Sequence, residues 1–459
     1  MTPNSGDTAW VLASAALVLL MTPGLAFFYG GMVRAKSVLN MMMMSFGALG
    51  LIGVLWVLYG YSLSFGNDAF GGLVGNFDFV GLKGLMSADP LGGVKGQSAG
   101  IPPLAFVAFQ AVFAIITVAL VSGAIADRAK FGAWMVFAGV WGTLVYFPVA
   151  HWVFAFDGYT GTTGGWIANN LKAIDFAGGT AVHINAGAAG LALALVLGKR
   201  IGFNKDPMRP HNLTLVMIGA GLLWFGWFGF NAGSALSAGN TAAVAWVNTM
   251  VATAAASLAW LATERIRDGH ATSLGAASGV VAGLVAITPA CSAVNPVGAI
   301  LVGAVAGIVC ALAIGLKFKL GYDDSLDVVG VHLVGGIAGT LLIGLLATAD
   351  APAGVDGLFY GGGLDQLWRQ AVAAGAVLVY SFVLAYVIGT VIDKVMGFRI
   401  PEESEVAGVD VTVHAESAYE FGSFTGGSYR ITTGSTTTKE RVDASSSSPR
   451  SSSRSSSTT

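Results

Sequence analysis

Residues 175–190 read D-F-A-G-G-T-A-V-H-I-N-A-G-A-A-G, an apolar run of small residues with one histidine, His183, near its middle. Residues 324–339 repeat the pattern as D-S-L-D-V-V-G-V-H-L-V-G-G-I-A-G, with His332 at the matching place. The two histidines are 149 residues apart, and glycine and valine positions around them keep the same register. The chain is therefore predicted to contain two copies of one helix.

Asp175 and Asp324 are also 149 residues apart, and each precedes its histidine by eight residues. At about 1.5 Å of rise per residue, each histidine would lie roughly 12 Å into its helix. The hydrocarbon core of a bilayer is about 30 Å thick, so both histidines would fall near its midplane.

The composition places the chain in a membrane. Of its 459 residues, 54% are hydrophobic and 10% are charged, whereas soluble domains are about one quarter charged. Gly accounts for 65 residues, and small residues allow transmembrane helices to approach closely. The net charge of −2 argues against a nucleic-acid partner.

Hydropathy predicts an all-α polytopic membrane protein with eleven transmembrane helices. The predicted spans are residues 8–32, 37–65, 103–126, 131–156, 176–198, 213–238, 241–263, 273–290, 295–316, 328–348 and 366–391. The connections after odd-numbered spans hold fourteen Lys and Arg residues and those after even-numbered spans hold four. Since positive charge is retained in the cytoplasm, the N-terminus is predicted outside and the C-terminus inside.

With this orientation the two repeated helices enter the membrane from opposite sides. Residues 8–198 and 213–348 are thus predicted to form a 5+5 inverted repeat, followed by helix 366–391. Inverted repeats place a shared site at the midplane. His183 and His332 become a candidate pair in one pore, although two unrelated, hydrogen-bonded core histidines are the simpler alternative. Ionisable residues inside a membrane usually mark function.

Residues 1–396 are expected to form the membrane domain. Residues 397–420 have a mixed sequence and are predicted to be an ordered cytoplasmic segment. Residues 421–459 are rich in Ser and Thr and are predicted to be a disordered tail.

Aromatic residues gather on two of the spans. Phe109 and Phe113 are four residues apart, hence on one helix face. The sixth span carries Trp227 and Phe230 between glycines, which leave room for a ring to move. Packing is the simpler reading of such a stripe, and a gate is the functional one.

Together these motifs resemble the ammonium transporter family, which is related to the Rhesus proteins. The likeness covers residues 6 to 420. It is carried by T-P-G-L-A-F-F-Y-G-G at Thr22–Gly31, D-F-A-G-G-T-A-V-H-I-N-A at Asp175–Ala186, G-W-F-G-F-N-A-G-S at Gly226–Ser234, V-N-T-M-V-A-T-A-A-A at Val247–Ala256, G-L-V-A-I-T-P-A-C at Gly283–Cys291, G-V-H at Gly330–His332 and G-F-R-I-P-E-E at Gly397–Glu403.

The resemblance implies a homotrimer in the plasma membrane with one pore per subunit, no cofactor and no metal. Ammonium and its analogue methylammonium would be the substrates, and PII-type signal proteins would contact the cytoplasmic segment. The implied roles are an outer recruitment site (Phe109, Phe113, Phe154, Ser234), a gate (Phe113, Phe230), a pore (His183, His332, Trp227) and a structural vestibule residue (Asp175).

One position departs from the family pattern. The family usually has A-H-W-V-W where this chain has Ala150–Phe154, ending in Phe154. Trp152 is two residues away, about 200° around a helix, so it cannot take the same place. Since Phe attracts cations less than Trp does, weaker recruitment is expected.

The expected function is ammonium uptake without enzymatic activity. A bare ion is costly to move through an apolar pore, whereas ammonia crosses easily. Two imidazoles could pass a proton separately, because each has a donor and an acceptor nitrogen. An ammonium sensor and a channel for another small neutral solute stay open as alternatives; a metal enzyme lacks a third ligand beside His183 and His332. Whether net charge crosses is also open.

Overall fold

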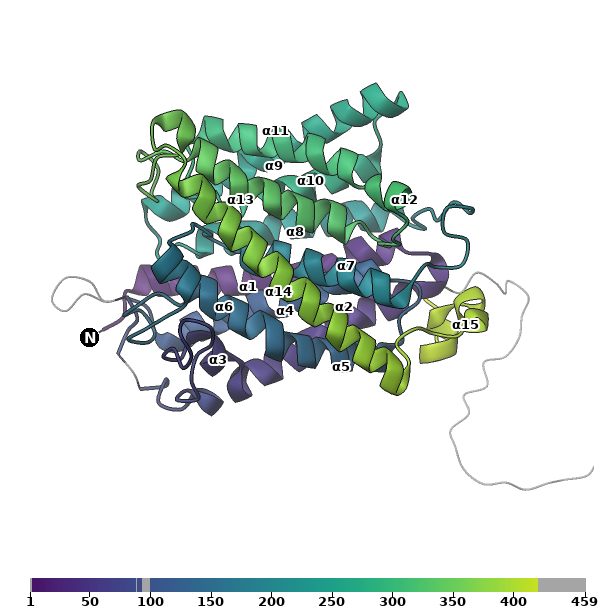
Figure 1. Ribbon diagram of the computed structural model, residues 1–459, viewed down its shortest axis with the longest axis horizontal. Coiled ribbons are helices and arrows are strands. Elements are labelled where there is room, and N and C mark those ends of the chain that lie inside the picture. Colours follow the sequence, from purple (N-terminus) through teal and green to yellow (C-terminus); the bar gives the residue numbers. More distant parts are fainter. Residues whose placement is uncertain (1, 88, 93–99, 420–459) are drawn as a thin grey trace, which may run out of the picture. The chain divides into compact units, whose positions relative to one another are not determined.

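The computed structural model describes residues 2–87, 89–92 and 100–419, and within them every regular element is a helix (Figure 1). The described residues contain isolated β-bridges but no β-strand. The predicted all-α class is therefore confirmed. The predicted disordered tail, residues 421–459, lies outside the described residues.

The helices fall into two halves that follow each other along the chain. The first half contains α1 (Ser5–Met32), α2 (Val38–Leu55), α3 (Tyr61–Phe65), α4 (Pro103–Val121), α5 (Phe131–Trp141), α6 (Phe147–Phe154) and α7 (Asn185–Leu197). The second half and the C-terminal part contain α8 (Leu213–Gly233), α9 (Asn240–Asp268), α10 (Ser273–Ile287), α11 (Pro296–Ala313), α12 (Leu316–Leu320), α13 (Val334–Leu346), α14 (Asp365–Met396) and α15 (Glu402–Ala407).

Six wider, π-helical turns occur among the described residues, and four of them lie within or at the start of a membrane-spanning stretch. These turns are η2 (Trp56–Gly60), η5 (Gly142–Tyr146), η6 (Ile167–Leu171), η7 (Gly179–Ile184), η8 (Val329–Leu333) and η10 (Asp410–His414). Turns of this kind are rare and often occur at functional sites. Two of them, η7 and η8, hold the repeated histidines, a feature that the sequence pattern does not predict.

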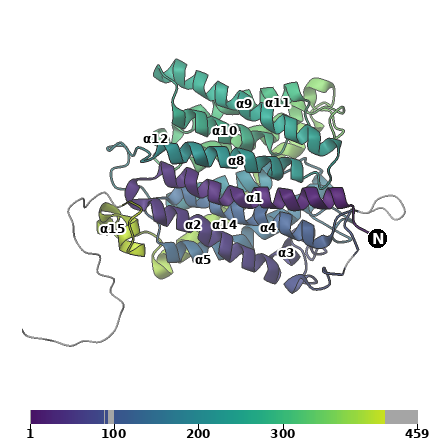
Figure 2. The ribbon, with the colours of Figure 1, turned by 180° about the vertical axis from the view of Figure 1, so that it is seen from behind.

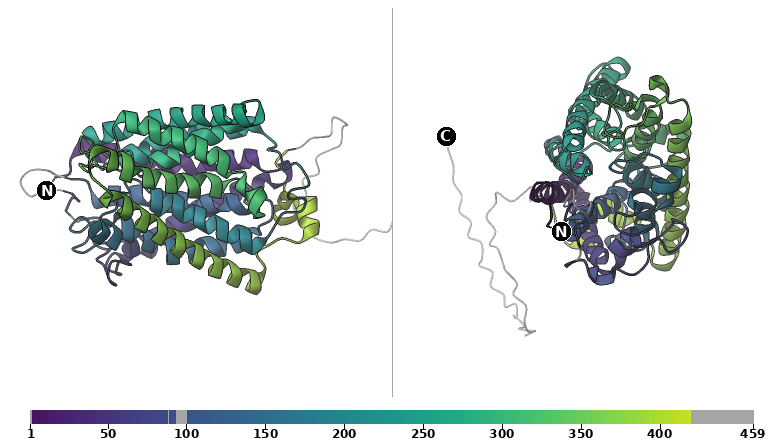
Figure 3. Two further views of the ribbon diagram at one scale, coloured as in Figure 1. Left: turned by 45° about the horizontal axis from the view of Figure 1, so that its top comes forward. Right: turned by 90° about the vertical axis from the view of Figure 1, so that its left-hand side faces the viewer.

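Within the described residues, ten helical stretches are long and apolar enough to cross a membrane. Joined by their 3₁₀ and π turns, they are Ser5–Met32, Ala35–Phe65, Pro103–Ile125, Phe131–Phe154, Gly179–Leu197, Leu213–Gly233, Asn240–Asp268, Pro296–Leu320, Val329–Leu346 and Asp365–Met396. The predicted eighth span corresponds to α10, an apolar helix of only 15 residues. The end-on view in Figure 3 shows these helices running roughly parallel to one another. An integral, multi-pass membrane fold is confirmed, while the count of eleven spans stays a prediction.

The first helices of the two halves run in opposite directions, as the predicted inverted repeat requires. Helices α1 and α8 lie side by side (Figure 2) and approach through glycines of α8. A Cβ at Gly219 would lie 2.3 Å from the Phe28 backbone nitrogen, and one at Gly233 would lie 2.5 Å from Ser14 Cβ. Because these contacts pair rising numbers in α8 with falling numbers in α1, the first helices of the two repeats are antiparallel.

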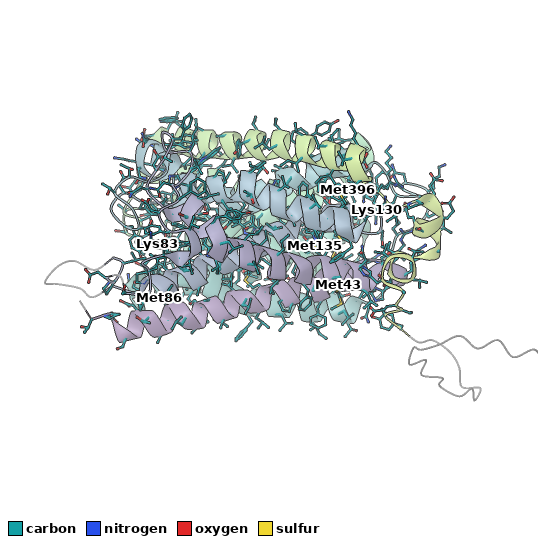
Figure 4. All side chains as sticks on the ribbon, turned by 90° about the horizontal axis from the view of Figure 1, so that it is seen from below. Met43, Lys83, Met86, Lys130, Met135 and Met396 are labelled. Atoms are coloured by element: carbon teal, nitrogen blue, oxygen red, sulfur yellow. The ribbon has the colours of Figure 1, made fainter. Side chains whose placement is uncertain are left out.

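The connections that hold Lys83 and Lys130 lie at opposite ends of the helices, as the charge pattern predicts. Figure 4 shows Lys83, from the connection after α3, at one end of the helices and Lys130, from the connection after α4, at the other. Met396, the last residue of α14, lies at the same end as Lys130 (Figure 4). The predicted N-out, C-in orientation is compatible with this arrangement and stays a prediction.

Residues 398–419, which we call the C-terminal segment, pack on that second end. The segment pairs with the connection after α4, where the Ile400 N–H donates to the Arg128 carbonyl (3.0 Å). The carboxylate of Asp410 accepts the backbone N–H groups of Leu39 (3.0 Å) and Asn40 (2.8 Å) at the start of α2. Since those N–H groups have no partner within the helix, Asp410 acts as a cap supplied from 370 residues away.

Candidate functional site

The two repeated histidines meet inside the protein. Both are buried, and Nδ1 of His332 lies 3.3 Å from Nδ1 of His183. Their ring centroids are 5.4 Å apart and the rings are nearly parallel, at 28°. One Nδ1 must carry a hydrogen and the other must accept it, so at least one of the two imidazoles is neutral in this arrangement.

An aspartate positions each histidine-bearing turn. The Asp175 carboxylate accepts the backbone N–H groups of Gly178 (2.8 Å), Gly179 (2.6 Å), Thr180 (2.8 Å) and Ala181 (3.2 Å), and it also accepts the Thr180 hydroxyl. These N–H groups lie at the N-terminal end of η7, where the helix dipole favours a negative charge. The carboxylate therefore holds the turn that carries the first histidine.

Asp324 does the same in the second repeat. Its carboxylate accepts the N–H groups of Val328 (3.1 Å) and Val329 (2.7 Å) at the start of η8. Asp324 lies just before the membrane-spanning stretch Val329–Leu346 and is fully buried, and this burial raises its pKa to about 6. The matched register found in the sequence thus corresponds to a matched hydrogen-bonding role.

Trp227 of α8 fixes the position of the first imidazole. Its indole ring stacks on His183, with centroids 5.4 Å apart and planes 23° apart. The indole N–H donates to the Thr288 hydroxyl (2.8 Å), which locks the ring. Nε2 of His183 is buried and has no partner among the described residues, so it is the polar atom of this ring that remains available.

The two imidazoles border a narrow cavity of about 10 Å³. A single water needs about 10–15 Å³ by the same measure and two to four polar partners. Among the described residues that line the cavity, none is charged. They are Met21, Leu25, Phe28, Ile116, Leu120, Val182, His183, Leu223, Trp227, Phe230, Val281 and His332.

A second cavity of about 90 Å³ lies on the other side of Phe230. We call it the outer pocket, after the predicted orientation. Its described lining residues are Phe106, Gln110, Phe113, Phe154, Phe156, Tyr159, Phe176, Ser234 and Leu236. None of these is an acid or a base, so aromatic faces and a few neutral polar groups form the pocket.

Stacked rings separate the two cavities. Phe113 lines the outer pocket and Phe230 lines the inner cavity, and their centroids are 4.0 Å apart with planes at 10°. Both side chains are buried. The stacked pair therefore lies between the outer pocket and the cavity that the imidazoles border.

The structure brings most of the predicted outer-site residues together. Phe154 lines the pocket with its ring 6.3 Å from that of Phe113, at 86°. The Ser234 hydroxyl also lines it and donates to the Phe230 carbonyl (2.8 Å). Phe109 differs, because it is fully buried behind Phe113, 4.9 Å away, and is not a lining residue.

Trp152 does not substitute for an aromatic residue at the pocket. Its indole N–H donates to the Leu73 carbonyl (2.7 Å), and its ring packs 4.7 Å from Tyr380. The expectation that it points elsewhere than Phe154 is thus confirmed.

The sequence analysis missed some of the residues that line the outer pocket, namely Phe156, Tyr159, Phe176 and Leu236. Most of them lie in irregular connections, where no periodicity marks a pocket-facing position.

A buried charge network joins several of the connections between helices. The Arg200 guanidinium bonds Asp323 (2.8 Å) and Asp127 (3.0 Å), and Arg34 contacts Asp127 (3.2 Å). Burial alone would raise the pKa of Asp323, but the hydrogen bonds from Arg200 outweigh it and lower that pKa. The network joins connections from both halves of the chain.

The C-terminal segment takes part in this network. The buried carboxylate of Glu405 accepts from the Arg399 guanidinium (2.8 Å) and from the Ile201 N–H (2.8 Å), and lies 3.7 Å from Arg34. The segment is therefore tied to the ends of the helices rather than merely adjacent to them.

These features define a class of protein: an all-helical, polytopic membrane protein whose two repeated helices bring paired histidines together beside a narrow cavity lined by uncharged residues. Comparison with known proteins is consistent with this class. The chain matches the Ammonium Transporter Family over residues 9–419. It is 63% identical over 435 residues to an ammonium transporter of Mycobacterium tuberculosis, covering 91% of each chain. It is 46% identical to an ammonium transporter of Bacillus subtilis, covering 90% of this chain and 98% of that one.

Solved structures agree. A sensor Amt protein superposes with a TM-score of 0.80 at 28% identity, covering 88% of this chain and 97% of that chain. The crystal structure of Saccharomyces cerevisiae Mep2 superposes with a TM-score of 0.77 at 32% identity, covering 88% and 91%. The chain belongs to the ammonium transporter family.

Proposed function

We propose that this protein transports ammonium across the cell membrane, and that nitrogen passes the centre of the pore as ammonia. The observation that carries this proposal is the stacked Phe113–Phe230 pair between an aromatic outer pocket and a cavity of about 10 Å³ bordered by two imidazoles. An ion cannot keep its hydration shell in so small an apolar space. Moving a bare ion there would be far more costly than moving a neutral molecule.

The outer pocket recruits the ion. Phe113 and Phe154 offer ring faces, and ring faces attract a cation through the negative face of the π-system. The Ser234 hydroxyl gives its own hydrogen to the Phe230 carbonyl, so its lone pairs are available to an ammonium N–H. Phe109 contributes from behind, by holding Phe113 in place.

Phe113 and Phe230 act as the gate. Their stack covers the entrance to the inner cavity, and displacing one ring opens it. Closing the stack excludes water, which strengthens the preference for a neutral molecule.

His183 and His332 carry the polar part of the inner pathway. A neutral imidazole can accept a hydrogen bond from ammonia or donate one to it. The ring pair can also pass on the proton that the ion loses, since Nδ1 of one faces Nδ1 of the other at 3.3 Å. Trp227 holds the first ring in position, and Asp175 holds its turn.

A sensor that uses the same pathway is the second candidate. It is favoured by the C-terminal segment, whose Glu405 and Asp410 connect it to helix ends in the first half of the chain. It is also favoured by similarity to a sensor Amt protein. Transport and sensing share the outer site, so they differ in flux rather than in binding.

The assembly and partners follow from family membership as further proposals. We expect a homotrimer with one pathway in each subunit, and a PII-type protein that contacts the C-terminal segment. Residues 1–396 would form the membrane domain, residues 397–420 the ordered cytoplasmic segment and residues 421–459 a flexible tail.

Purified protein in liposomes tests the proposed function. An ammonium gradient should produce a saturable flux, measured as a change in internal pH and as current on a supported membrane. Sustained current would mean that charge crosses with the nitrogen, and flux without current would mean that ammonia crosses alone. Binding of ammonium without flux would favour the sensor, and absence of both would refute the proposal.

A further inference from the structure

The outer pocket has a polar wall that the aromatic site does not account for. Besides Ser234, two of its lining side chains carry an oxygen: Gln110 of α4 and Tyr159 of the connection after α6. An ammonium ion has four N–H donors in a tetrahedral arrangement. A single hydroxyl satisfies one of them, so the remaining acceptors must come from this wall or from water.

Gln110 is placed as an acceptor would be. Its side chain is 7% exposed, and its Oε1 is buried with no hydrogen-bond partner among the described residues. A buried acceptor without a donor costs about 1–3 kcal/mol. Gln110 lines the outer pocket, and the last torsion of a glutamine is broad and roughly two-fold, so the amide can rotate without leaving its place. A cation with N–H donors in the pocket would give the oxygen the partner that it lacks.

Tyr159 reaches the pocket from a loop that is tightly held. The Gly158 N–H donates to the Gly161 carbonyl (2.8 Å), and the Gly164 N–H donates to the Asp157 carboxylate (2.7 Å). The tyrosine ring packs on Phe106 with centroids 5.5 Å apart. Burial raises the pKa of Tyr159, so its hydroxyl remains neutral. A neutral hydroxyl accepts through its lone pairs and adds no charge to the pocket.

We propose that Gln110 and Tyr159 are specificity-determining residues of the outer site, where they accept N–H groups of the bound ammonium ion together with Ser234. This inference rests on the proposed recruitment of ammonium at the outer pocket. The aromatic rings respond to the charge of the ion, whereas the three oxygens respond to its hydrogen-bond donors. The site therefore distinguishes ammonium from cations of the same charge that carry fewer N–H groups.

The test removes each acceptor with little change of shape. Tyr159→Phe removes the hydroxyl alone, and Gln110→Met keeps an unbranched side chain of similar length. Tyr360→Phe is the matched control, because the Tyr360 hydroxyl bonds Asn295 (2.9 Å) and Tyr360 is not among the pocket's lining residues. Each variant is purified and its folding checked by gel filtration and thermal unfolding. Saturable ammonium flux in liposomes is then measured for each variant.

Inhibition by methylammonium, dimethylammonium and trimethylammonium supplies the decisive comparison, because methyl groups replace the N–H donors one at a time. Each acceptor substitution should raise the half-saturation concentration for ammonium roughly five- to tenfold, the size expected for the net contribution of one hydrogen bond that competes with water. The shift should shrink along the series to less than about twofold for trimethylammonium.

A purely structural role would change the affinity for every ligand by the same factor. That uniform shift, or unchanged values in both variants, would overturn the inference while leaving the proposed function intact. Absence of saturable ammonium flux or binding in the wild type would instead refute the proposed function itself.

Discussion

Replacing His332 by alanine tests whether the imidazoles keep the pathway dry. The cavity beside the histidines measures about 10 Å³, and removing a five-atom ring would add room for roughly two waters, at about 30 Å³ each. Water also needs polar partners. The substitution supplies them, because Nδ1 of His183 loses its partner at 3.3 Å and Nε2 of the same ring already lacks one.

Hydration of the constriction should admit ions. If two waters lower the barrier to a bare cation by about 3 kcal/mol, potassium flux should rise on the order of 100-fold, since each 1.4 kcal/mol corresponds to a factor of ten. His332→Leu is the matched control, because leucine fills a similar volume without polar atoms. Potassium flux should stay at the wild-type level in the leucine variant. Any proton-coupled current should be lost in both variants.

The assay compares ammonium and potassium currents of the wild type and both variants in the same liposomes, with the equivalent His183 variants alongside. Equal potassium flux in the alanine and leucine variants would show that the ring does not exclude water. Unaltered flux, selectivity and current in all variants would refute the reasoning and return both histidines to a packing role.

Three further outcomes are expected. Phe154→Trp should lower the half-saturation concentration for ammonium modestly, by the ~0.5–1 kcal/mol of an exposed cation–π pair; an unchanged value would mean that this side chain does not face the ion. Truncation after Glu420 should leave assembly and uptake intact, whereas truncation before Gly397 removes the Glu405 and Asp410 contacts and should impair regulation; gel filtration and uptake assays distinguish them. Burial raises the pKa of Asp324 to about 6, against about 4 in an unfolded chain, so its contribution to stability falls as the pH rises from 4 to 6. Asp324→Asn should therefore unfold at a higher temperature than the wild type at pH 7.5 and lose that advantage by pH 5.

The sequence predicted the elements that depend on long-range periodicity and matched spacing. Apolar runs located the spanning helices within a few residues, although α9 extends to Asp268 and α14 to Met396, beyond their predicted ends. The constant offset paired His183 with His332 because an inverted repeat leaves few other arrangements for them. The same offset paired Asp175 with Asp324, and in the structure each carboxylate accepts the N–H groups of the residues four and five positions further on.

Other parts of the site could not be predicted from the sequence. The π-helical turns η7 and η8 differ from an α-helix by one extra residue in each hydrogen-bonded turn. The small residues around the histidines suit both kinds of turn, so the sequence does not distinguish them. Tyr159 and Phe176 reach the outer pocket from irregular connections whose path is set by loop hydrogen bonds. Phe109 and Phe113 share a helix face, yet packing of the neighbouring helices leaves one behind the other.

The contact between the two Nδ1 atoms makes the repeat chemically unequal. A single hydrogen occupies the 3.3 Å gap, so one ring offers an acceptor at Nε2 and the other offers a donor. Each proton that passes through the pair leaves it in the opposite tautomeric state. Both rings must exchange tautomers before another proton can follow in the same direction. If the pair relays protons as proposed, this exchange of tautomers sets an upper limit on the rate of proton movement, and that limit is independent of how fast ammonia itself diffuses.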